Sequence, residues 1–234
     1  MRVKIYNNNI VHLIFPNQKE LTMTMCRLQE FYESDNVKLR SRIFTFEQFI
    51  DQYTHKDGCF DYFSFWGGFN IPGHVVEDFF DVFELTNREL EVRKATKKYS
   101  RKPYYLIGTL IKDVETTKHE LLHAYYYLDT VYKQQVDVIV KFMNKDLKKS
   151  MTLALKNMGY ANHVIIDEIN AYMASSTHKY LKNDLDLDLT KADMKPFVEL
   201  SKTVLRGSYS GNTLAFQAKA RSSILLPRSN IKGE

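Results

Sequence analysis

The sequence lacks the features that mark several classes of protein. It has only two cysteines, Cys26 and Cys59, and no C-x-x-C spacing, which argues against a disulfide framework and against a zinc site built from thiolates. No apolar run approaches the roughly 20 residues that span a bilayer. The start, "MRVKIYNNNIVHLIF", has no unbroken apolar core and no small-residue cleavage site of a signal peptide. We therefore expect a cytoplasmic protein that does not enter a membrane.

Internal repeats and low-complexity linkers are absent as well. A chain of 234 residues with 44% hydrophobic content is sufficient for one large domain with a packed core. The net charge of +5 is modest but unevenly placed: segment 93–102, "RKATKKYSRK", has six cations and no acid, and 201–234 has six cations against Glu234 alone. Such clusters bind phosphate or acidic protein in some chains and are a solvated loop and tail in others.

The first half of the chain reads as a mixture of strands and helices. Apolar residues alternate around an Asn-rich turn within residues 3–15, which predicts a β-hairpin. Helical spacing follows over 19–33, and Thr45 with Gln48 forms a capping-box pattern before "FEQFIDQY". The aromatic loop 59–73, "CFDYFSFWGGFNIPG", either lines a substrate cleft or fills the core under a long loop.

The second half is mostly helical in pattern. The segment 103–111, "PYYLIGTLI", predicts a strand, after which Asp113 can cap a helix. An apolar stripe then runs to Gly159, a predicted helix end, and Asn162 is expected to cap a helix over "HVIIDEINAYMASSTHKYL". The fold class expected from this order is α+β, mostly helical, with a small N-terminal sheet.

The helix after the predicted strand contains "HELLH", residues 119–123. Residues four apart lie on one face of a helix, so His119 and His123 can direct imidazole nitrogens at one ion. Glu120 then lies beside the ion, where it can accept a proton from water. A catalytic zinc needs a third protein ligand and an open position, which the rest of the chain must provide.

Three residues are candidates for the third ligand. Asp129 follows His119 by ten residues, but "HAYYYLDTVY" reads as unbroken helix and would carry it away from His123. Glu168, in "DEINAY", is preferred because a second, antiparallel helix can present a carboxylate to a histidine pair. His163 is the fallback ligand. Asp167, about 100° round the helix from Glu168, could instead orient an imidazole.

The strand, the "HELLH" helix and the downstream "DEINAY" together resemble the zincin metallopeptidases, in particular their glutamate-ligand (gluzincin) branch. The resemblance covers about residues 104–180 and implies that His119, His123 and Glu168 bind Zn²⁺ with Glu120 as general base. We expect one zincin-like domain over 1–234, with an N-terminal α+β lobe (1–100), a helical metal-binding core (101–200) and a basic C-terminal segment (201–234).

The same resemblance implies how a protein or peptide substrate binds. In zincins an edge strand before the metal-binding helix holds extended substrate, which assigns this role to "YYLIGTLI" and to Tyr105, Ile107 and Gly108 within it. Zincins often add a tyrosine or histidine that donates to the developing oxyanion. Tyr172, His178 and Tyr209 are the residues available for this role.

Two alternatives to the peptidase remain. His119 and His123 can be ordinary helix residues paired with Glu115 or Glu120, because a five-residue motif with three fixed positions recurs by chance. The chain can also be a zinc-stabilised binding protein that contacts nucleic acid or a protein partner through 93–102 and the C-terminal segment. A structural zinc site is closed by four protein ligands, whereas the sequence offers three, which favours the enzyme.

Overall fold

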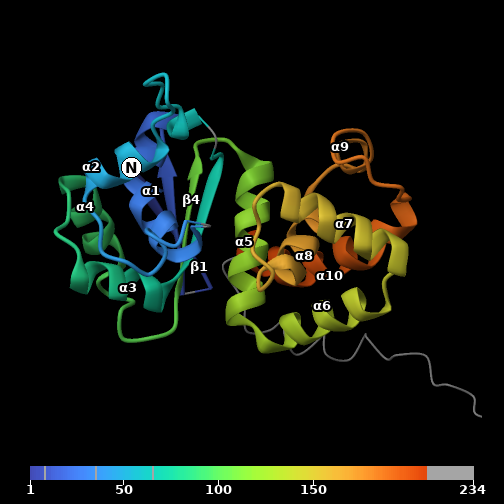
Figure 1. Cartoon of the computed structure of the whole chain (residues 1–234). Coiled ribbons are helices and arrows are strands. Elements are labelled where there is room, and N and C mark those ends of the chain that lie inside the picture. The colour runs from blue at the N-terminus through green and yellow to red at the C-terminus, as the bar shows by residue number, and fades with distance from the viewer. Residues whose placement is uncertain (8, 35, 65, 210–234) are drawn as a thin grey trace, which may run out of the picture.

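The computed structural model describes residues 1–7, 9–34, 36–64 and 66–209. Residues 207–209 are described by their backbone only. Helices dominate, and one small mixed sheet lies among the N-terminal elements, so the chain has an α+β fold (Figure 1). Within the described residues the elements are β1 (Arg2–Tyr6), β2 (Ile10–Phe15), α1 (Gln18–Glu33), α2 (Phe46–Tyr53), the 3₁₀ turn η1 (Tyr62–Ser64), β3 (Gly68–Pro72), α3 (Gly73–Val82), α4 (Asn87–Thr96), β4 (Tyr105–Leu110), α5 (Val114–Leu128), α6 (Thr130–Phe142), α7 (Lys145–Asn157), α8 (Ile165–Ser175), α9 (His178–Asn183) and α10 (Lys191–Tyr209).

The sheet has the strand order β1-β2-β4-β3. β1 and β2 form the expected hairpin, β2 runs parallel to β4, and β3 runs antiparallel to β4. β4 therefore has a neighbour on both sides. The expectation that the strand before the metal-binding helix lies at an edge is wrong, because β3, far back in the sequence, pairs with its outer side.

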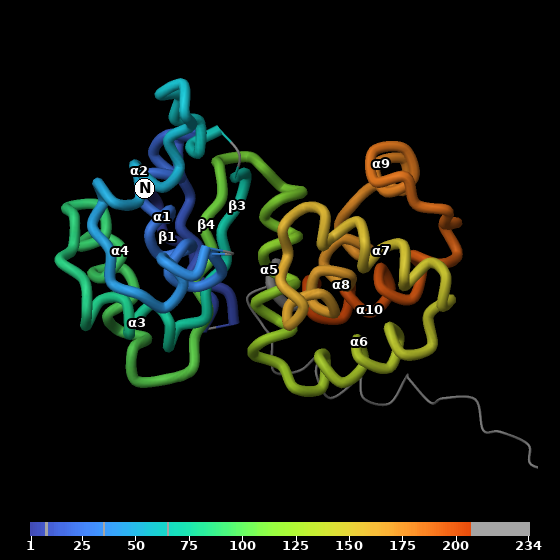
Figure 2. The backbone as a smooth tube through the Cα atoms, viewed as in Figure 1, coloured from blue at the N-terminus to red at the C-terminus, as the bar shows by residue number. Residues whose placement is uncertain are grey.

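The sheet separates two hydrophobic clusters because successive strand residues point to opposite faces. Val11 and Leu106 face α1 and the aromatic cluster of the N-terminal lobe. Ile10, Tyr105 and Ile107 face the other way and pack with α5 and the helices behind it. Figures 1 and 2 show α5 lying between the sheet and the helices α6 to α10.

The boundaries of these two lobes differ from those expected. β4 completes the N-terminal sheet, so that lobe extends to Leu110 and not to residue 100. Residues 201–209 continue α10, the last helix of the C-terminal lobe, and are not a separate segment. The rest of the expected basic segment, 210–234, lies outside the described residues. No described helix is both long enough and apolar enough to cross a membrane.

Helix caps confirm some predicted boundaries and correct others. The capping box of Thr45 and Gln48 opens α2, and the Asp113 side chain accepts from the Thr116 amide at the start of α5. Asn162 does not cap α8, which begins at Ile165 without a side-chain cap. The single helix expected after it is two helices, since the chain breaks after α8 and Thr177 caps α9.

His12 is a buried histidine of β2 whose environment predicts a pH effect. Its Nε2 pairs with Thr109 Oγ1 at 2.8 Å, and the ring is 3% exposed. Burial, with a smaller effect from Lys4, lowers the pKa of His12 to about 4. As the pH falls, His12 is therefore protonated near pH 6.5 in the unfolded chain but only near pH 4 in the folded chain. Between these pH values, protonation favours the unfolded chain and lowers stability. We expect this residue to remove about 2 to 3 kcal/mol of stability between pH 7.5 and 4.5.

Urea unfolding of the wild type and of His12→Gln at the two pH values measures this contribution. The carboxyl groups titrate in both proteins, so the difference in pH dependence isolates His12. The variant is expected to have the shallower acid loss. The same loss of stability in both proteins would mean that the folded chain accommodates protonated His12.

Candidate metal centre

Three side chains from two helices meet beside the sheet. α5 places His119 and His123 on one face, one turn apart, and their rings are 4.8 Å apart between centroids. α8 packs against α5 and brings Glu168 to them. The two carboxylate oxygens lie 3.7 Å from His119 Nε2 and 3.6 Å from His123 Nε2. Within the described part of the chain this is the only group of three such residues that could hold a metal ion.

The outer nitrogen of each histidine is held by a partner on α8. His123 Nδ1 lies 2.9 Å from Asp167 Oδ2, and His119 Nδ1 lies 3.2 Å from Ser175 Oγ. The Ser175 hydroxyl donates to Ala171 O, so its oxygen is free to accept from His119. Both Nδ1 atoms are then donors, which leaves both Nε2 lone pairs directed at the Glu168 carboxylate.

The donor set fits a metal ion. His123 Nε2 and Glu168 Oε2 are buried and have no hydrogen-bond partner, which is costly unless something else satisfies them. Two ligands at ordinary zinc distances are about 3.4 Å apart in a tetrahedral site, close to the 3.6 and 3.7 Å found here. Small side-chain movements would therefore complete the coordination.

The charges around His123 also favour a cation at this point. Burial alone lowers the pKa of the His123 ring, but the carboxylates of Asp167 and Glu168 outweigh burial and hold that pKa well above its ordinary value. The pocket therefore stabilises a positive charge between these groups, which a coordinated ion would supply.

Glu120, next to the first histidine, is held from the sheet side. Its Oε2 accepts from Asn70 Nδ2 at 2.8 Å, and Asn70 Oδ1 accepts in turn from the Tyr105 hydroxyl at 2.7 Å. Burial raises the pKa of Glu120, while His119 and His123 act against this rise. A carboxylate whose pKa is raised by burial is a better proton acceptor than an exposed one, and this one lies beside the candidate metal ligands.

Gly68 of β3 makes the close approach to Glu120 possible. A Cβ atom built at Gly68 would lie 2.2 Å from Glu120 Oε1 and 2.6 Å from Thr116 Cγ2. A side chain at this position would displace the carboxylate. Its neighbour Gly67 has no such restriction, because a Cβ there would meet its nearest atom, Thr116 Oγ1, at 3.8 Å.

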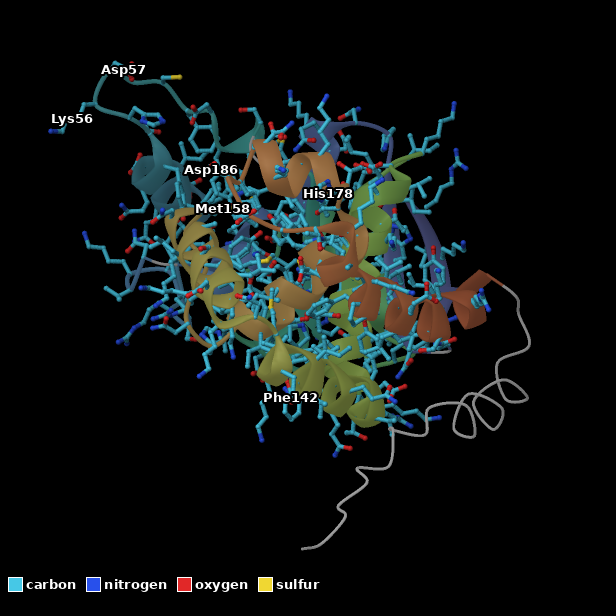
Figure 3. The ribbon with its side chains drawn as sticks, turned by 90° about the vertical axis from the view of Figure 1, so that its right-hand side faces the viewer. Lys56, Asp57, Phe142, Met158, His178 and Asp186 are labelled. Atoms are coloured by element: carbon cyan, nitrogen blue, oxygen red, sulfur yellow. The ribbon has the colours of Figure 1, made fainter. Side chains whose placement is uncertain are left out.

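The three metal-binding candidates and Glu120 open into a cleft of about 910 Å³. One wall comes from the end of α1 and from the segment between α2 and β3, whose tip at Lys56 and Asp57 projects from the molecule in Figure 3. The other wall comes from α5, α8 and residues 158–164. No lysine or arginine is among the described residues that line the cleft.

The aromatic loop contributes to both the cleft and the core. Tyr62 and Trp66 line the cleft, whereas Phe69 is buried in the N-terminal hydrophobic cluster. Tyr62 also belongs to that cluster. Rings of this loop therefore both line a cleft and fill the core, and binding of substrate in that cleft stays a prediction.

The residues expected to stabilise an oxyanion are placed differently from one another. Tyr172 lines the cleft, with its ring 4.9 Å from that of His119 and its hydroxyl 3.2 Å from that of Tyr160. His178, labelled in Figure 3, does not line the cleft; its Nε2 donates to Leu189 O. Tyr209 is the last residue of α10 and not part of a loop, and its side chain lies outside the described residues.

The substrate contacts expected along β4 are corrected by the sheet. Both sides of β4 are paired, so its backbone cannot add a further strand. Ile107 is buried in the C-terminal hydrophobic cluster, and Gly108 faces Leu21 and Met25 of α1. Tyr105 touches the site through Asn70 and does not line the cleft.

The other candidate ligands have separate positions. Asp129 ends α5 and caps α6 by accepting from the amides of Val131 and Tyr132. The helix is therefore broken there, contrary to expectation, and the Asp129 carboxylate is occupied. His163 is exposed at the cleft wall and is not in the three-residue group. Asp167 orients His123, as its place beside Glu168 suggested.

The cations of segment 93–102 lie at the end of α4 and in the turn that follows, and all six are exposed. They belong to the N-terminal lobe and do not line the cleft. Binding of nucleic acid there stays a prediction. The cations of 219–232 lie outside the described residues.

Sequence reasoning missed Gly68, Asn70 and Ser175. Asn70 is 50 residues from Glu120, and Ser175 is 56 residues from His119. The Gly67–Gly68 pair is visible in the sequence of the aromatic loop, where paired glycines are typical of a turn. A glycine that is needed for close approach looks the same in a sequence as a glycine that is needed for a turn.

Comparison with known proteins gives no match to this chain. No family model fits it, and no curated protein and no solved structure is detectably similar. The functional argument therefore rests on the residues of the cleft and their chemistry.

Asp167 offers a test of how the histidine is oriented. We expect Asp167→Asn to weaken zinc binding by about 10- to 100-fold, because the amide keeps the shape but not the charge that holds His123. Competition with a calibrated chelator measures the dissociation constant, and unfolding of the metal-free protein checks the fold. An unchanged affinity would show that Asp167 does not support the ligand.

Proposed function

We propose that this chain is a zinc-dependent peptidase of the zincin type, with His119, His123 and Glu168 as its zinc ligands. One observation carries the proposal: two imidazole Nε2 atoms and a buried carboxylate converge, and two of these atoms, His123 Nε2 and Glu168 Oε2, have no hydrogen-bond partner. Two histidines and a glutamate are a donor set of catalytic zinc sites, and three protein ligands leave one position open. The metal could instead be another divalent ion, which metal analysis decides.

The other residues of the cleft then have distinct roles. When bound, zinc would polarise an attacking water and the substrate carbonyl. Glu120, held by Asn70, accepts the proton of the water and returns it to the leaving amine. Tyr172 remains our candidate for the donor to the oxyanion, with Tyr160 beside it.

The substrate strand in this proposal lies along β3 and not along β4. Among the described residues, β3 pairs only with β4 and so is an edge of the sheet. Its residues Gly68 and Asn70 line the cleft beside Glu120. An extended peptide that pairs with this edge would have its backbone next to the general base.

We also place the protein in the cytoplasm. Cys26 and Cys59 are both unpaired, and Cys59 is exposed. An exposed free thiol is better preserved in a reducing compartment.

Cleavage of a peptide library tests the function. The zinc-loaded protein is expected to produce new peptide termini that disappear with a chelator and return when zinc is added. Mass spectrometry of the products identifies the cleaved bonds. No cleavage across a diverse library by protein with full zinc occupancy would overturn the proposal and favour a zinc-stabilised binding protein.

Gly68 and Gly67 form a matched pair for testing the position of Glu120. Gly68→Ala is expected to lower kcat/KM by about 10- to 100-fold, because its Cβ displaces the general base from its place. Gly67→Ala adds the same methyl group one residue away, where a Cβ meets nothing closer than 3.8 Å, and should leave activity near wild type. Both variants should retain zinc. Equal activity of the two variants would contradict the close approach of β3 to Glu120.

A further inference from the structure

The wall of the cleft formed by the end of α1 carries carboxyl groups that no described lysine or arginine neutralises. Glu30 and Glu33 line the cleft, and neither forms an ion pair with any described lysine or arginine. Buried or half-buried carboxyl groups are normally paired, because desolvation of an unpaired charge is costly.

Gln29 adds an unsatisfied acceptor to the same wall. Its Nε2 donates to Glu33 Oε2 at 3.1 Å, which leaves the amide oxygen directed elsewhere. Gln29 is 7% exposed, and its Oε1 is buried without a hydrogen-bond partner. A buried carbonyl oxygen without a partner calls for a donor from outside the described chain.

The carboxylate of Glu30 is already fixed in place. It accepts from the hydroxyl of Tyr62 at 2.6 Å and from that of Tyr53. The rings of Tyr53 and Tyr62 lie 4.7 Å apart, and Trp66 follows them along the cleft. Aromatic faces next to carboxylates suit an apolar stem that ends in a positive charge.

We propose that Gln29, Glu30 and Glu33 form a pocket for a cationic group of the peptide substrate. With Glu33 ionised, the pocket presents carboxylate and amide oxygens, which match an ammonium or guanidinium group with several N–H donors. The cation is the side chain of a lysine or arginine residue or the α-amino group at the start of the peptide. The inference deepens the proposed peptidase function and rests on it, since the pocket opens into the cleft that holds Glu120.

A metal ion is a poorer occupant of this pocket. The described residues contain one group with the spacing of metal ligands, and it includes neither Glu30 nor Glu33. Burial and the nearby Glu168 carboxylate raise the pKa of Glu33 to about 8, although His123 acts against this rise. A cation bound beside Glu33 would favour its ionised form.

Peptide binding, measured separately from cleavage, tests the pocket. The probes are four alanine-rich heptapeptides: blocked at both ends with a central lysine, blocked with norleucine, blocked with glutamate, and the norleucine peptide with a free α-amine. Calorimetry with the zinc-loaded protein gives their affinities. We expect the lysine peptide, the free-amine peptide or both to bind at least about tenfold more tightly than the blocked norleucine peptide.

Two carboxyl-to-amide variants locate the effect. Glu33→Gln should remove the preference for the cationic peptides. Glu115→Gln makes the same carboxyl-to-amide change at an exposed residue of the same cleft and should keep the preference for the cationic peptides. Zinc content and thermal unfolding of both variants check that site and fold are intact.

The results separate the pocket from the peptidase. Equal affinity for the lysine, free-amine and blocked norleucine peptides, or a preference that survives in Glu33→Gln, overturns the pocket whether or not the protein cleaves peptides. Equal losses of affinity for the cationic peptides in Glu33→Gln and Glu115→Gln also overturn the pocket, because they indicate a general charge effect. Selective binding without any cleavage keeps the pocket and removes the peptidase. The lysine and free-amine arms show which cation is bound.

Discussion

Purified in the presence of zinc, the wild-type chain is expected to hold one zinc ion, and the His119→Ala/His123→Ala variant none. The two imidazoles supply two of the three ligand atoms in the cluster, and a single carboxylate cannot retain zinc through dialysis on its own. Elemental analysis of the dialysed proteins gives the ratio of metal to chain. The same analysis identifies the metal, with zinc favoured by two nitrogen ligands and one oxygen ligand.

Glu168→Gln and Asp129→Asn are the matched pair for the third ligand. Both replace a carboxylate by its amide. Glu168 lies within 3.7 Å of both histidines, so its amide should weaken zinc binding by far the more. Asp129 caps α6, so its amide should affect stability and leave the metal bound. If Asp129→Asn weakened zinc binding more than Glu168→Gln, the third ligand would have to be assigned to the C-terminal end of α5. If the His119→Ala/His123→Ala variant still held one zinc ion per chain, the proposed site would be wrong.

Local sequence determines some of the candidate ligands more directly than others. The spacing of His119 and His123 fixes their common helix face before any tertiary contact forms. Glu168 required a further assumption, that a later helix packs against the first, and the contact between α5 and α8 confirms it. Asp167 followed from its place beside Glu168 on the same helix.

Helix breaks were predictable in principle but were missed. Asp129 and Asn144 each follow an apolar stripe and cap the next helix through their side chains. Both residues are among those preferred at the N-cap. The apolar spacing continues across both residues, because successive helices that pack on one core direct their apolar faces to the same side. The spacing alone therefore does not reveal where one helix ends and the next begins.

The sheet order could not be read from the sequence. β4 is local to α5, whereas its outer neighbour β3 begins 37 residues earlier at Gly68. Strand pairing over such a distance depends on the packing of whole elements, not on a local pattern. Glu120, the proposed general base, is held from β3 by Asn70, so the part of the site that depends on the sheet was also the part that was missed.

Glu120→Gln is expected to separate metal binding from catalysis. Glu120 is not in the group of ligand atoms, so the variant should hold zinc as the wild type does. Glutamine keeps the size of the side chain, and its carbonyl oxygen can still accept from Asn70. It cannot accept a proton from water. Loss of a general base typically costs about 10²- to 10⁴-fold in rate, and kcat should fall by this factor on any peptide that the wild type cleaves.

The control for this variant is Asn70→Ala, which removes the hydrogen bond to Glu120 but keeps the carboxylate. Its activity should fall between those of the wild type and Glu120→Gln, because a misplaced base still accepts protons with lower efficiency. Adding Asn70→Ala to Glu120→Gln should therefore cost little further activity, since Asn70 acts through Glu120. Equal cleavage by the wild type and Glu120→Gln, with the same bonds cut, would show that another group accepts the proton. Full additivity of the two changes would instead mean that Asn70 acts on the substrate directly, as an edge-strand residue facing the cleft.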